Sequence, residues 1–176
     1  MKKIILSVLF ALSVNTILAQ SVFDKFDDQE GITAVVVNKK MFSLLSKMEV
    51  KDKESEQYVS LIRKLENLKV YVTQSSKKAS DMKLVSDNYI KSAMLEELIK
   101  INEKDRVVKV YVKSGSTEDQ IKEMLMFIDG QENKETVLMS LTGDFNLDEL
   151  SILTDKMKLP GGADLKKVAK TNKSAK

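Results

Sequence analysis

The 176-residue sequence contains neither cysteine nor histidine, and its 43% hydrophobic and 31% charged residues are typical of a globular domain. These absences exclude disulfide bonds, thiol nucleophiles, iron–sulfur clusters and histidine-dependent triads or zinc sites, so we expect no cofactor. The net charge is +3, but two lysines near the N-terminus and five in residues 165–176 supply seven positive charges. Residues 21–164 therefore carry four net negative charges, and nucleic acid is not an expected partner.

The first twenty residues have the pattern of a secretory signal peptide. Lys2 and Lys3 form a positive start, residues 4–12 form an apolar run, and Ala19 and Gln20 offer a cleavage position. The apolar run is shorter than the roughly 20 residues that span a bilayer core, and no cysteine follows it for lipid attachment. We therefore expect the mature protein to be periplasmic or secreted, with no transmembrane segment and no lipid anchor.

Helix and strand patterns alternate in the N-terminal part of the mature chain. Residues 21–29 predict a short helix that ends at Gly31, and the β-branched residues 32–37 predict a buried strand. Asn38 is expected to cap an amphipathic helix and Asp52 to begin a second one. The apolar residues expected on the buried faces are Met41, Leu44, Leu45 and Met48 in the first helix, and Tyr58, Leu61, Ile62 and Leu65 in the second.

Strand patterns dominate the rest of the chain. Residues 68–73 and 107–113 alternate with period two, which is typical of strands. The intervening residues 77–101 carry apolar side chains at helical spacing and predict a long helix, either continuous or broken near Tyr89. Residues 121–128 fit a helix or a strand, but the Asp-Gly turn after them and the strand-like residues 136–142 favour a β-hairpin.

Together these elements predict a single α+β domain with a mostly antiparallel sheet and helices packed on one face. We place the signal peptide at residues 1–20 and the domain at residues 21–160, because Pro160 is followed by two glycines. The lysine-rich residues 161–176 are expected to form a flexible tail.

The end of the predicted domain has a distinctive sequence, Leu-Met-Ser-Leu-Thr-Gly-Asp-Phe-Asn-Leu-Asp-Glu-Leu at residues 138–150. With the exported N-terminus, the aliphatic-aromatic strand and the long middle helix, it resembles the domain of unknown function 4252 family over roughly residues 21–160. The resemblance implies a small exported protein of Gram-negative bacteria and carries no catalytic residues. Many members have a lipobox cysteine, which this sequence lacks, so the resemblance does not imply a lipid anchor.

A calcium-loop pattern near the C-terminus is better explained as a helix start. Asp144, Asn146 and Asp148 stand at loop positions 1, 3 and 5, and Asp155 stands at position 12. The loop needs a glycine where Glu149 stands. We therefore expect Asn146 and Glu149 to form a capping box for a short helix.

Two further patterns also have simpler explanations than catalysis or metal binding. Ser-x-x-Lys occurs at residues 75–78 and 80–83, followed by Ser-Asp-Asn at 86–88, as in serine acyl-transferases. The motifs lie almost adjacent and no Lys-Thr-Gly follows, so a solvated, capped helix start is the preferred interpretation. Met124 and Met126 could suggest copper ligation, but thioethers usually fill cores, and we expect them to be packed inside.

One sheet face is the candidate binding surface. In each alternating strand the valines take one face, and lysine and tyrosine take the other. If helices cover the valines, the opposite face is open and offers rigid aromatic rings beside positive charges, a combination enriched at binding sites. The predicted binding residues are Tyr71, Tyr111, Lys69, Lys109 and Lys113.

The sequence therefore predicts a non-enzymatic protein of the bacterial cell envelope. Its expected partner is an envelope protein or another macromolecule. The alternative is a hydrolase that uses two carboxylates to cleave an envelope glycan, because such a pair can be assembled from distant positions in the sequence.

Overall fold

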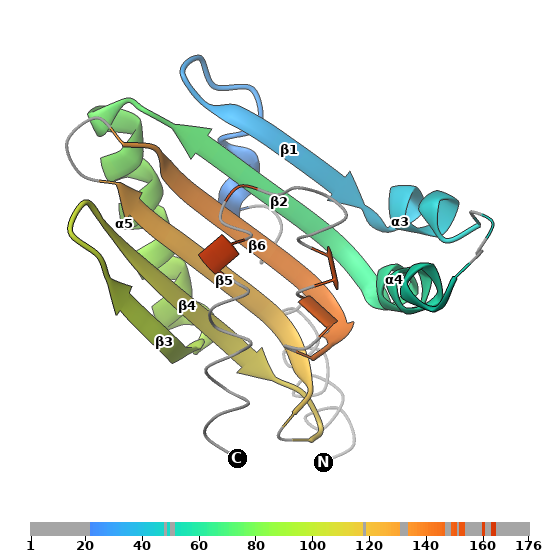
Figure 1. The fold of residues 1–176 in the computed structure, drawn as a ribbon. Helices are drawn as coiled ribbons and strands as arrows, with labels where there is room; N and C mark the ends of the chain where they lie inside the picture. The colour runs from blue at the N-terminus through green and yellow to red at the C-terminus, as the bar shows by residue number, and fades with distance from the viewer. Residues whose placement is uncertain are drawn as a thin grey trace, which may run out of the picture.

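The computed structural model describes residues 22–47, 49, 52–117, 119–130, 134–146, 149–150, 152–153, 160 and 163–164 (Figure 1). The predicted signal peptide and most of the predicted tail lie outside these residues. A helical turn at residues 22–24 comes first. The elements that follow are β1 (Thr33–Asn38), α3 (Lys39–Leu45), α4 (Lys53–Lys64), β2 (Leu65–Thr73), α5 (Ser76–Ala93), β3 (Glu96–Asn102), β4 (Arg106–Ser114), β5 (Ile121–Gly130) and β6 (Thr136–Phe145).

The strands form one six-stranded sheet in the order β1-β2-β6-β5-β4-β3, and every neighbouring pair is antiparallel. Strands β3 to β6 follow one another as a meander, while β2 pairs with β6 and places β1 at the far edge. The predicted α+β class with an antiparallel sheet is confirmed. The hairpin of β5 and β6 is also confirmed, because Met124 lies opposite Leu141 on adjacent strands.

Each face of the sheet carries its own buried cluster. The valine face includes Val70, Val110, Met126 and Met139, which lie side by side across four strands and are packed with Leu61 and Ile62 of α4. The tyrosine face includes Tyr71, Leu125, Phe127 and Leu138, packed with Met82 and Tyr89 of α5. Figure 1 shows α5 behind the sheet, and α3 and α4 beside one end of β1 and β2. The expectation that the helices pack on one face is not confirmed, since helices contribute to both clusters.

The helix predicted over residues 77–101 extends beyond the helix found in the structure. Helix α5 ends at Ala93, and residues 96–102 form β3 instead. Met94 adopts the left-handed conformation at φ 54°, and the backbone N–H of Leu95 donates to the carbonyl of Ile90 at 3.0 Å. Glycine is the usual residue at such a helix end, so a methionine there hides the stop signal from sequence analysis.

The helix after β1 starts as predicted but buries a different residue. The side chain of Asn38 accepts from the backbone N–H of Met41 at 3.0 Å, which confirms the cap. Phe42 is buried, whereas Met41 and Leu44 are exposed, so the predicted apolar face is wrong at these two positions. Leu45 packs against the core as predicted, and Met48 lies outside the described residues. Strand β1 itself is an edge strand with half-exposed valines, and not the buried strand expected.

Helix caps predicted from short motifs are confirmed elsewhere in the chain. Asp52 accepts from the backbone N–H of Ser55 at 2.9 Å, and Ser75 caps α5. Asn146 and Glu149 form the reciprocal capping box, with the two backbone-to-side-chain bonds at 3.1 and 3.0 Å.

A partly buried charge pair joins β4 to a residue within the range assigned to the tail. Arg106 donates from both terminal nitrogens to the carboxylate of Asp164, at 3.1 and 3.0 Å. Asp164 is buried, and Arg106 also pairs with Glu103 at 2.6 Å. Bidentate pairs of this kind fix geometry as well as charge. No helix among the described residues is long and apolar enough to cross a membrane.

Candidate binding groove

The five predicted site residues share the tyrosine face but do not form one site. Residues Lys69, Ser140, Leu125 and Tyr111 occupy a single row across β2, β6, β5 and β4. Two strands therefore separate the lysine and tyrosine of β2 from those of β4, a distance of about 14 Å at normal strand spacing. Helix α5 packs on the same face, so the face is not the open platform that the alternation predicted.

Tyr71 belongs to the core and is removed from the candidate site. Its side chain is 0% exposed, and its hydroxyl donates to Asp27 at 2.6 Å. Phe26 packs edge-on against the ring, with centroids 5.7 Å apart. Burial, followed by the hydrogen bond and charge of Asp27, raises the pKa of Tyr71 well above its ordinary value.

Lys69 is also enclosed. Its exposed fraction is 8%, its ammonium group pairs with Asp24, and burial lowers its pKa. The segment that covers Lys69 and Tyr71 is the N-terminal turn, whose Phe23 and Phe26 are buried. In this turn a Phe-Asp pair occurs twice, three residues apart, at residues 23–24 and 26–27. This repeat is the signal that sequence analysis missed, because its two aspartates bind the lysine and the tyrosine of β2.

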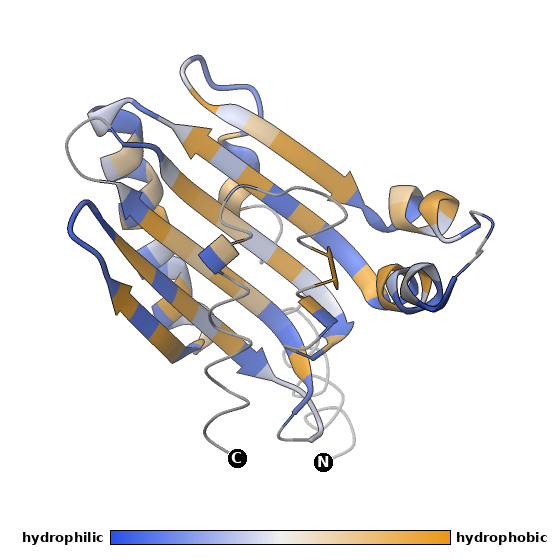
Figure 2. Ribbon diagram, in the orientation of Figure 1, coloured by the Kyte–Doolittle hydropathy of each residue, from blue (hydrophilic) through white to orange (hydrophobic). Residues whose placement is uncertain are grey.

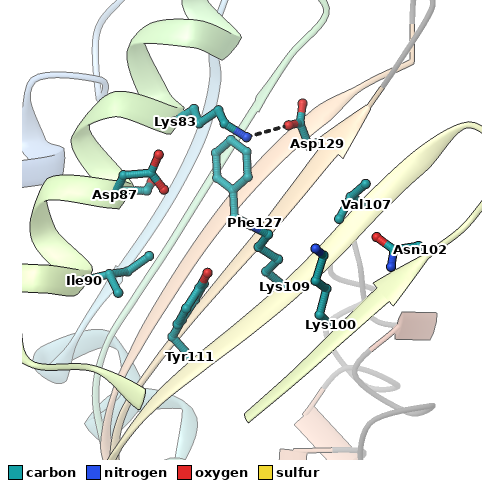
Figure 3. A pocket seen from close by; sticks show the side chains of 11 residues that line it. Lys83, Asp87, Ile90, Lys100, Asn102, Val107, Lys109, Tyr111, Phe127 and Asp129 are labelled. Carbon is teal, nitrogen blue, oxygen red and sulfur yellow. Dashed lines mark hydrogen bonds and ion pairs between the residues drawn. The ribbon is translucent and has the colours of Figure 1, made fainter. Parts of the chain in front are cut away.

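Tyr111 and Lys109 lie on the other side of α5 and line a groove between this helix and strands β3 and β4 (Figure 3). The groove encloses about 180 Å³. Lys113, farther along β4, is exposed, stands opposite Glu123 and is not among the lining residues. The lining residues come from α5, β3, β4 and β5 and include Lys83, Asp87, Ile90, Lys100, Lys109, Tyr111, Phe127 and Asp129.

Two lysines meet in this groove from adjacent strands. Lys100 of β3 and Lys109 of β4 are direct cross-strand partners, and both line the groove. Like charges directly opposite each other destabilise a sheet. Among the described residues, no hydrogen bond or ion pair to either ammonium group is found. The pair therefore brings two positive charges without an ion-pair partner among the described residues into a partly enclosed site, which suits an anionic group.

The other charged side chains of the groove form no ion pair with Lys100 or Lys109 among the described residues. Lys83 of α5 pairs with Asp129 of β5 at 2.8 Å and lies over the ring of Phe127 at 5.8 Å from its centroid. Asp87 faces the groove from α5 (Figure 3). Burial raises the pKa of Tyr111 to about 12, with further contributions from a hydrogen bond to Glu97 and the charges of Glu97 and Asp87. Its hydroxyl is therefore neutral at physiological pH, with its proton donated to Glu97.

Residues 26–153 match the protein family described as Domain of unknown function (DUF4252). The chain belongs to this family. The match runs from Phe26 through all six strands to Leu153 and includes every groove-lining residue, which confirms the resemblance drawn from residues 138–150. No curated protein and no solved structure matches the chain.

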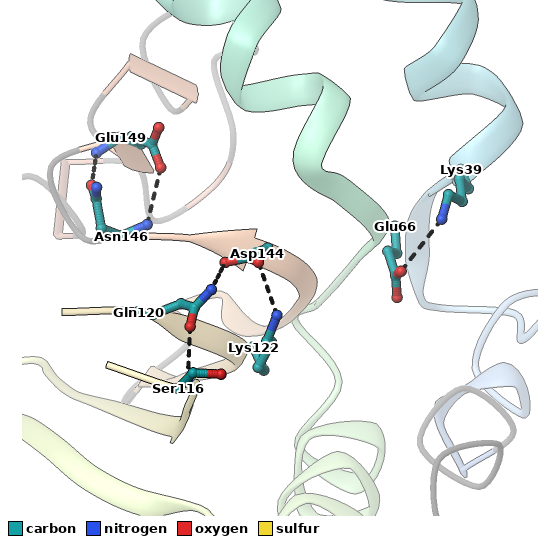
Figure 4. A network of polar contacts seen from close by, with 8 residues as sticks. All are labelled: Lys39, Glu66, Ser116, Gln120, Lys122, Asp144, Asn146 and Glu149. Atoms are coloured by element: carbon teal, nitrogen blue, oxygen red, sulfur yellow. Dashed lines mark hydrogen bonds and ion pairs between the residues drawn. The ribbon is translucent and has the colours of Figure 1, made fainter. Parts of the chain in front are cut away.

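The DUF4252 domain has a second, polar hollow at the end of β6, and its charges are paired (Figure 4). Asp144 accepts from Gln120 and from Lys122, the latter at 2.9 Å, and these contacts lower its pKa. Glu149 pairs with Lys64 at 2.6 Å. Among the described residues, no group of three potential ligands can hold a metal ion. Internal pairing favours a structural role for this hollow.

A buried carboxyl group lies beneath α5 in the DUF4252 domain. Glu123 of β5 accepts a hydrogen bond from Tyr89 at 2.6 Å, and both side chains are buried. Burial raises the pKa of Glu123, while the hydrogen bond and the charge of Lys113 oppose that shift. Glu123 is not among the groove-lining residues, so it connects helix and sheet and does not face a ligand.

Proposed function

We propose that this protein is an exported, non-enzymatic component of the bacterial envelope that binds an acidic segment of another protein in the groove between α5 and strands β3 and β4. The observation that carries the proposal is the pair Lys100 and Lys109, which are direct cross-strand partners and both line the groove. A carboxylate between them relieves their repulsion and contributes two charge-assisted hydrogen bonds. The signal-peptide pattern of residues 1–20 supports export.

The surroundings of the lysine pair favour a protein segment over a free anion. Tyr111, Phe127 and Ile90 add apolar and aromatic surface to the same groove. The Tyr111 hydroxyl donates its proton to Glu97, and its oxygen can accept a hydrogen bond from a backbone N–H of the segment. Binding surfaces typically combine such a buried aromatic anchor with polar groups at the rim.

A carboxylate hydrolase is the less well supported alternative. Asp87 and Asp129 both line the groove, but Asp129 is paired with Lys83 at 2.8 Å. A glycosidase needs a proton-donating carboxyl whose pKa is raised, placed beside the substrate. Glu123 has a raised pKa but is buried against Tyr89 outside the groove lining. The observed arrangement therefore supports binding.

Site-specific photo-crosslinking in the native envelope tests the proposal. A photoreactive residue at Asn102, on the groove wall, is expected to capture a protein partner. The same residue at Leu84, which is exposed on α5 and is not among the groove-lining residues, serves as the control. Capture only from position 84, or from neither position, contradicts the groove assignment.

A charge-matched pair of variants then tests the lysines. The K100Q/K109Q double variant is expected to weaken binding of the captured partner at least about tenfold, and the loss should shrink at high salt. The K77Q/K91Q control removes the same charge from exposed positions on α5 and should bind like the wild type. Equal weakening in both variants would mean that only net charge matters. Hydrolysis of an envelope glycan by the wild type, lost in D87N/D129N, would establish the alternative.

A further inference from the structure

The two edges of the sheet are built differently. Strand β3, at one edge, carries Glu96, Glu97 and Lys100, and its pairing with β4 is interrupted by a register shift between Glu97 and Ile99. Charged side chains and bulges are the usual features that stop an edge strand from pairing with another chain. Strand β1, at the other edge, has no charged residue from Thr33 to Asn38 and pairs with β2 without a register shift.

The β1 edge is also where exposed apolar residues concentrate. Val35 and Val36 are 43% and 47% exposed although they point to opposite faces of the sheet. Met41 and Leu44 of α3, which follows β1 directly, are exposed as well. These four belong to a set of seven exposed large hydrophobic residues among the described residues. Figure 2 shows β1 as a hydrophobic stretch that ends where the polar start of α3 begins.

We propose that β1 is a self-association edge, at which the β1 strands of two copies of this chain pair antiparallel about a two-fold axis at Val35. The pairing joins two six-stranded sheets into one continuous sheet. A two-fold interface uses the same patch on both copies, so an uncharged, β-branched strand is complementary to itself. It also brings the half-exposed valines of both copies together.

The charges that flank β1 favour a second copy as the occupant. Glu30 precedes the strand and Lys40 follows it, and both side chains are exposed. Among the described residues, neither forms an ion pair. Antiparallel pairing centred on Val35 places the end of β1 that Glu30 precedes beside the end of the other copy's β1 that Lys40 follows. Opposite charges across neighbouring strands stabilise pairing, and a parallel arrangement would place like charges together.

Charge substitutions at the two-fold axis test the proposal. Sedimentation of the protein produced from the full chain should show a concentration-dependent dimer. V35K and V35E should each raise the dimer dissociation constant at least about tenfold, because the substituted side chain meets its own copy across the axis. A mixture of the two variants should recover the dimer. Circular dichroism and melting curves report whether each variant is folded.

A cysteine crosslink tests the geometry without a charge. Directly opposed residues of antiparallel strands have Cα atoms about 4.5–5.5 Å apart, within the range of a disulfide. The chain contains no cysteine, so V35C introduces a single thiol and should form a covalent dimer under mild oxidation. L98C, at an exposed position on the β3 edge, is the matched control and should crosslink much more slowly.

The flanking charges test the antiparallel direction of the pairing. E30K and K40E should each weaken the dimer, and the double variant E30K/K40E should restore it. A monomer at every concentration tested would overturn the proposal, as would equal crosslinking of V35C and L98C. A dimer that is unchanged in both V35K and V35E would place the interface elsewhere. A monomer whose β1 edge pairs with a strand of a different protein would exclude a second copy as the occupant.

Discussion

Tyr71 and Tyr111 occur in the same four-residue sequence, Lys-Val-Tyr-Val, yet they have different environments. Tyr71 lies under the N-terminal turn and donates to Asp27, whereas Tyr111 lies beyond α5 and lines the groove. Alternation along a strand decides which face a side chain takes, but the partner that covers that face comes from elsewhere in the chain. The same residue type is therefore a core residue in one strand and a candidate binding residue in the other.

Truncation of the two tyrosines should separate these environments. Y71A is expected to lower the free energy of unfolding by about 3–5 kcal/mol, because it empties a fully buried aromatic position. Y111A, at a half-buried groove position, should cost about 1 kcal/mol and weaken partner binding. Urea denaturation of both variants measures the difference. Equal losses would place both rings in comparable surroundings.

Glu123 provides a pH-dependent prediction. The folded state raises its pKa above 4.5 through burial, so the folded state favours the protonated form. Its contribution to stability is fully present below the unfolded-state pKa and is lost as the pH rises through the folded-state pKa. E123Q retains an acceptor for Tyr89 without the buried charge, so its melting temperature should exceed that of the wild type at pH 7.

The same comparison near pH 4 is the control for E123Q, since the wild-type side chain is then largely protonated. The advantage of the variant should disappear there. A lower melting temperature for E123Q at pH 7 would mean that the ionised carboxylate is stabilised by Tyr89 and Lys113 more than burial opposes it.

At the scale of elements, helix starts are predictable from the sequence and one helix end is not. Asn38, Asp52 and Ser75 cap helices through their own short side chains, and these residue types are recognisable in sequence. The end of α5 depends on Met94 in a left-handed conformation, which methionine rarely adopts. Consequently the sequence pattern predicts a helix where β3 lies, and it does not reveal the Lys100 that β3 contributes to the groove.

Met94 is therefore a site for stabilisation. Glycine has no steric penalty in the left-handed region, and the Met94 side chain is 77% exposed, so little packing is lost. M94G should raise the free energy of unfolding by about 0.5–1 kcal/mol. M94A keeps the Cβ atom and should give no such gain. Thermal denaturation distinguishes these outcomes, and a loss of stability in M94G would indicate that the methionine side chain contributes packing.

At the scale of the whole molecule, the fold positions two distinct surfaces at opposite ends of one sheet. The groove lies beside β3 and β4, and the exposed apolar edge is β1, on the far side of the strand order. A dimer paired through β1 leaves both grooves accessible at its two ends. Two linked sites bind a partner that carries two acidic segments more tightly than one site does.

Export is the prediction that concerns the whole chain. N-terminal sequencing of the protein isolated from its native envelope should start at Gln20 or Ser21, with no lipid attached, because Ala19 ends a signal-peptide pattern and no cysteine follows. Cell fractionation provides the accompanying control. Retention of residues 1–19 on the isolated protein would contradict export.

Local patterns in the sequence are sufficient for the features that depend on near neighbours. The alternation of residues 68–73 and 107–113 identifies β2 and β4, and the Asn146–Glu149 spacing identifies the capping box. The lack of histidine and cysteine excludes imidazole and thiol chemistry whatever fold the chain adopts. The local inferences hold because strand faces and helix caps are set within a few residues.

Only the tertiary structure decided which side chains share a site. Lys100 and Lys109 become neighbours through the β3–β4 register, and Tyr71 and Tyr111 are separated because β5 and β6 lie between their strands. The burial of Lys69 and Tyr71 depends on an N-terminal turn more than 40 positions away in the sequence. Periodicity specifies the face of a strand but not the order of strands or what covers them, because both depend on contacts between distant parts of the chain.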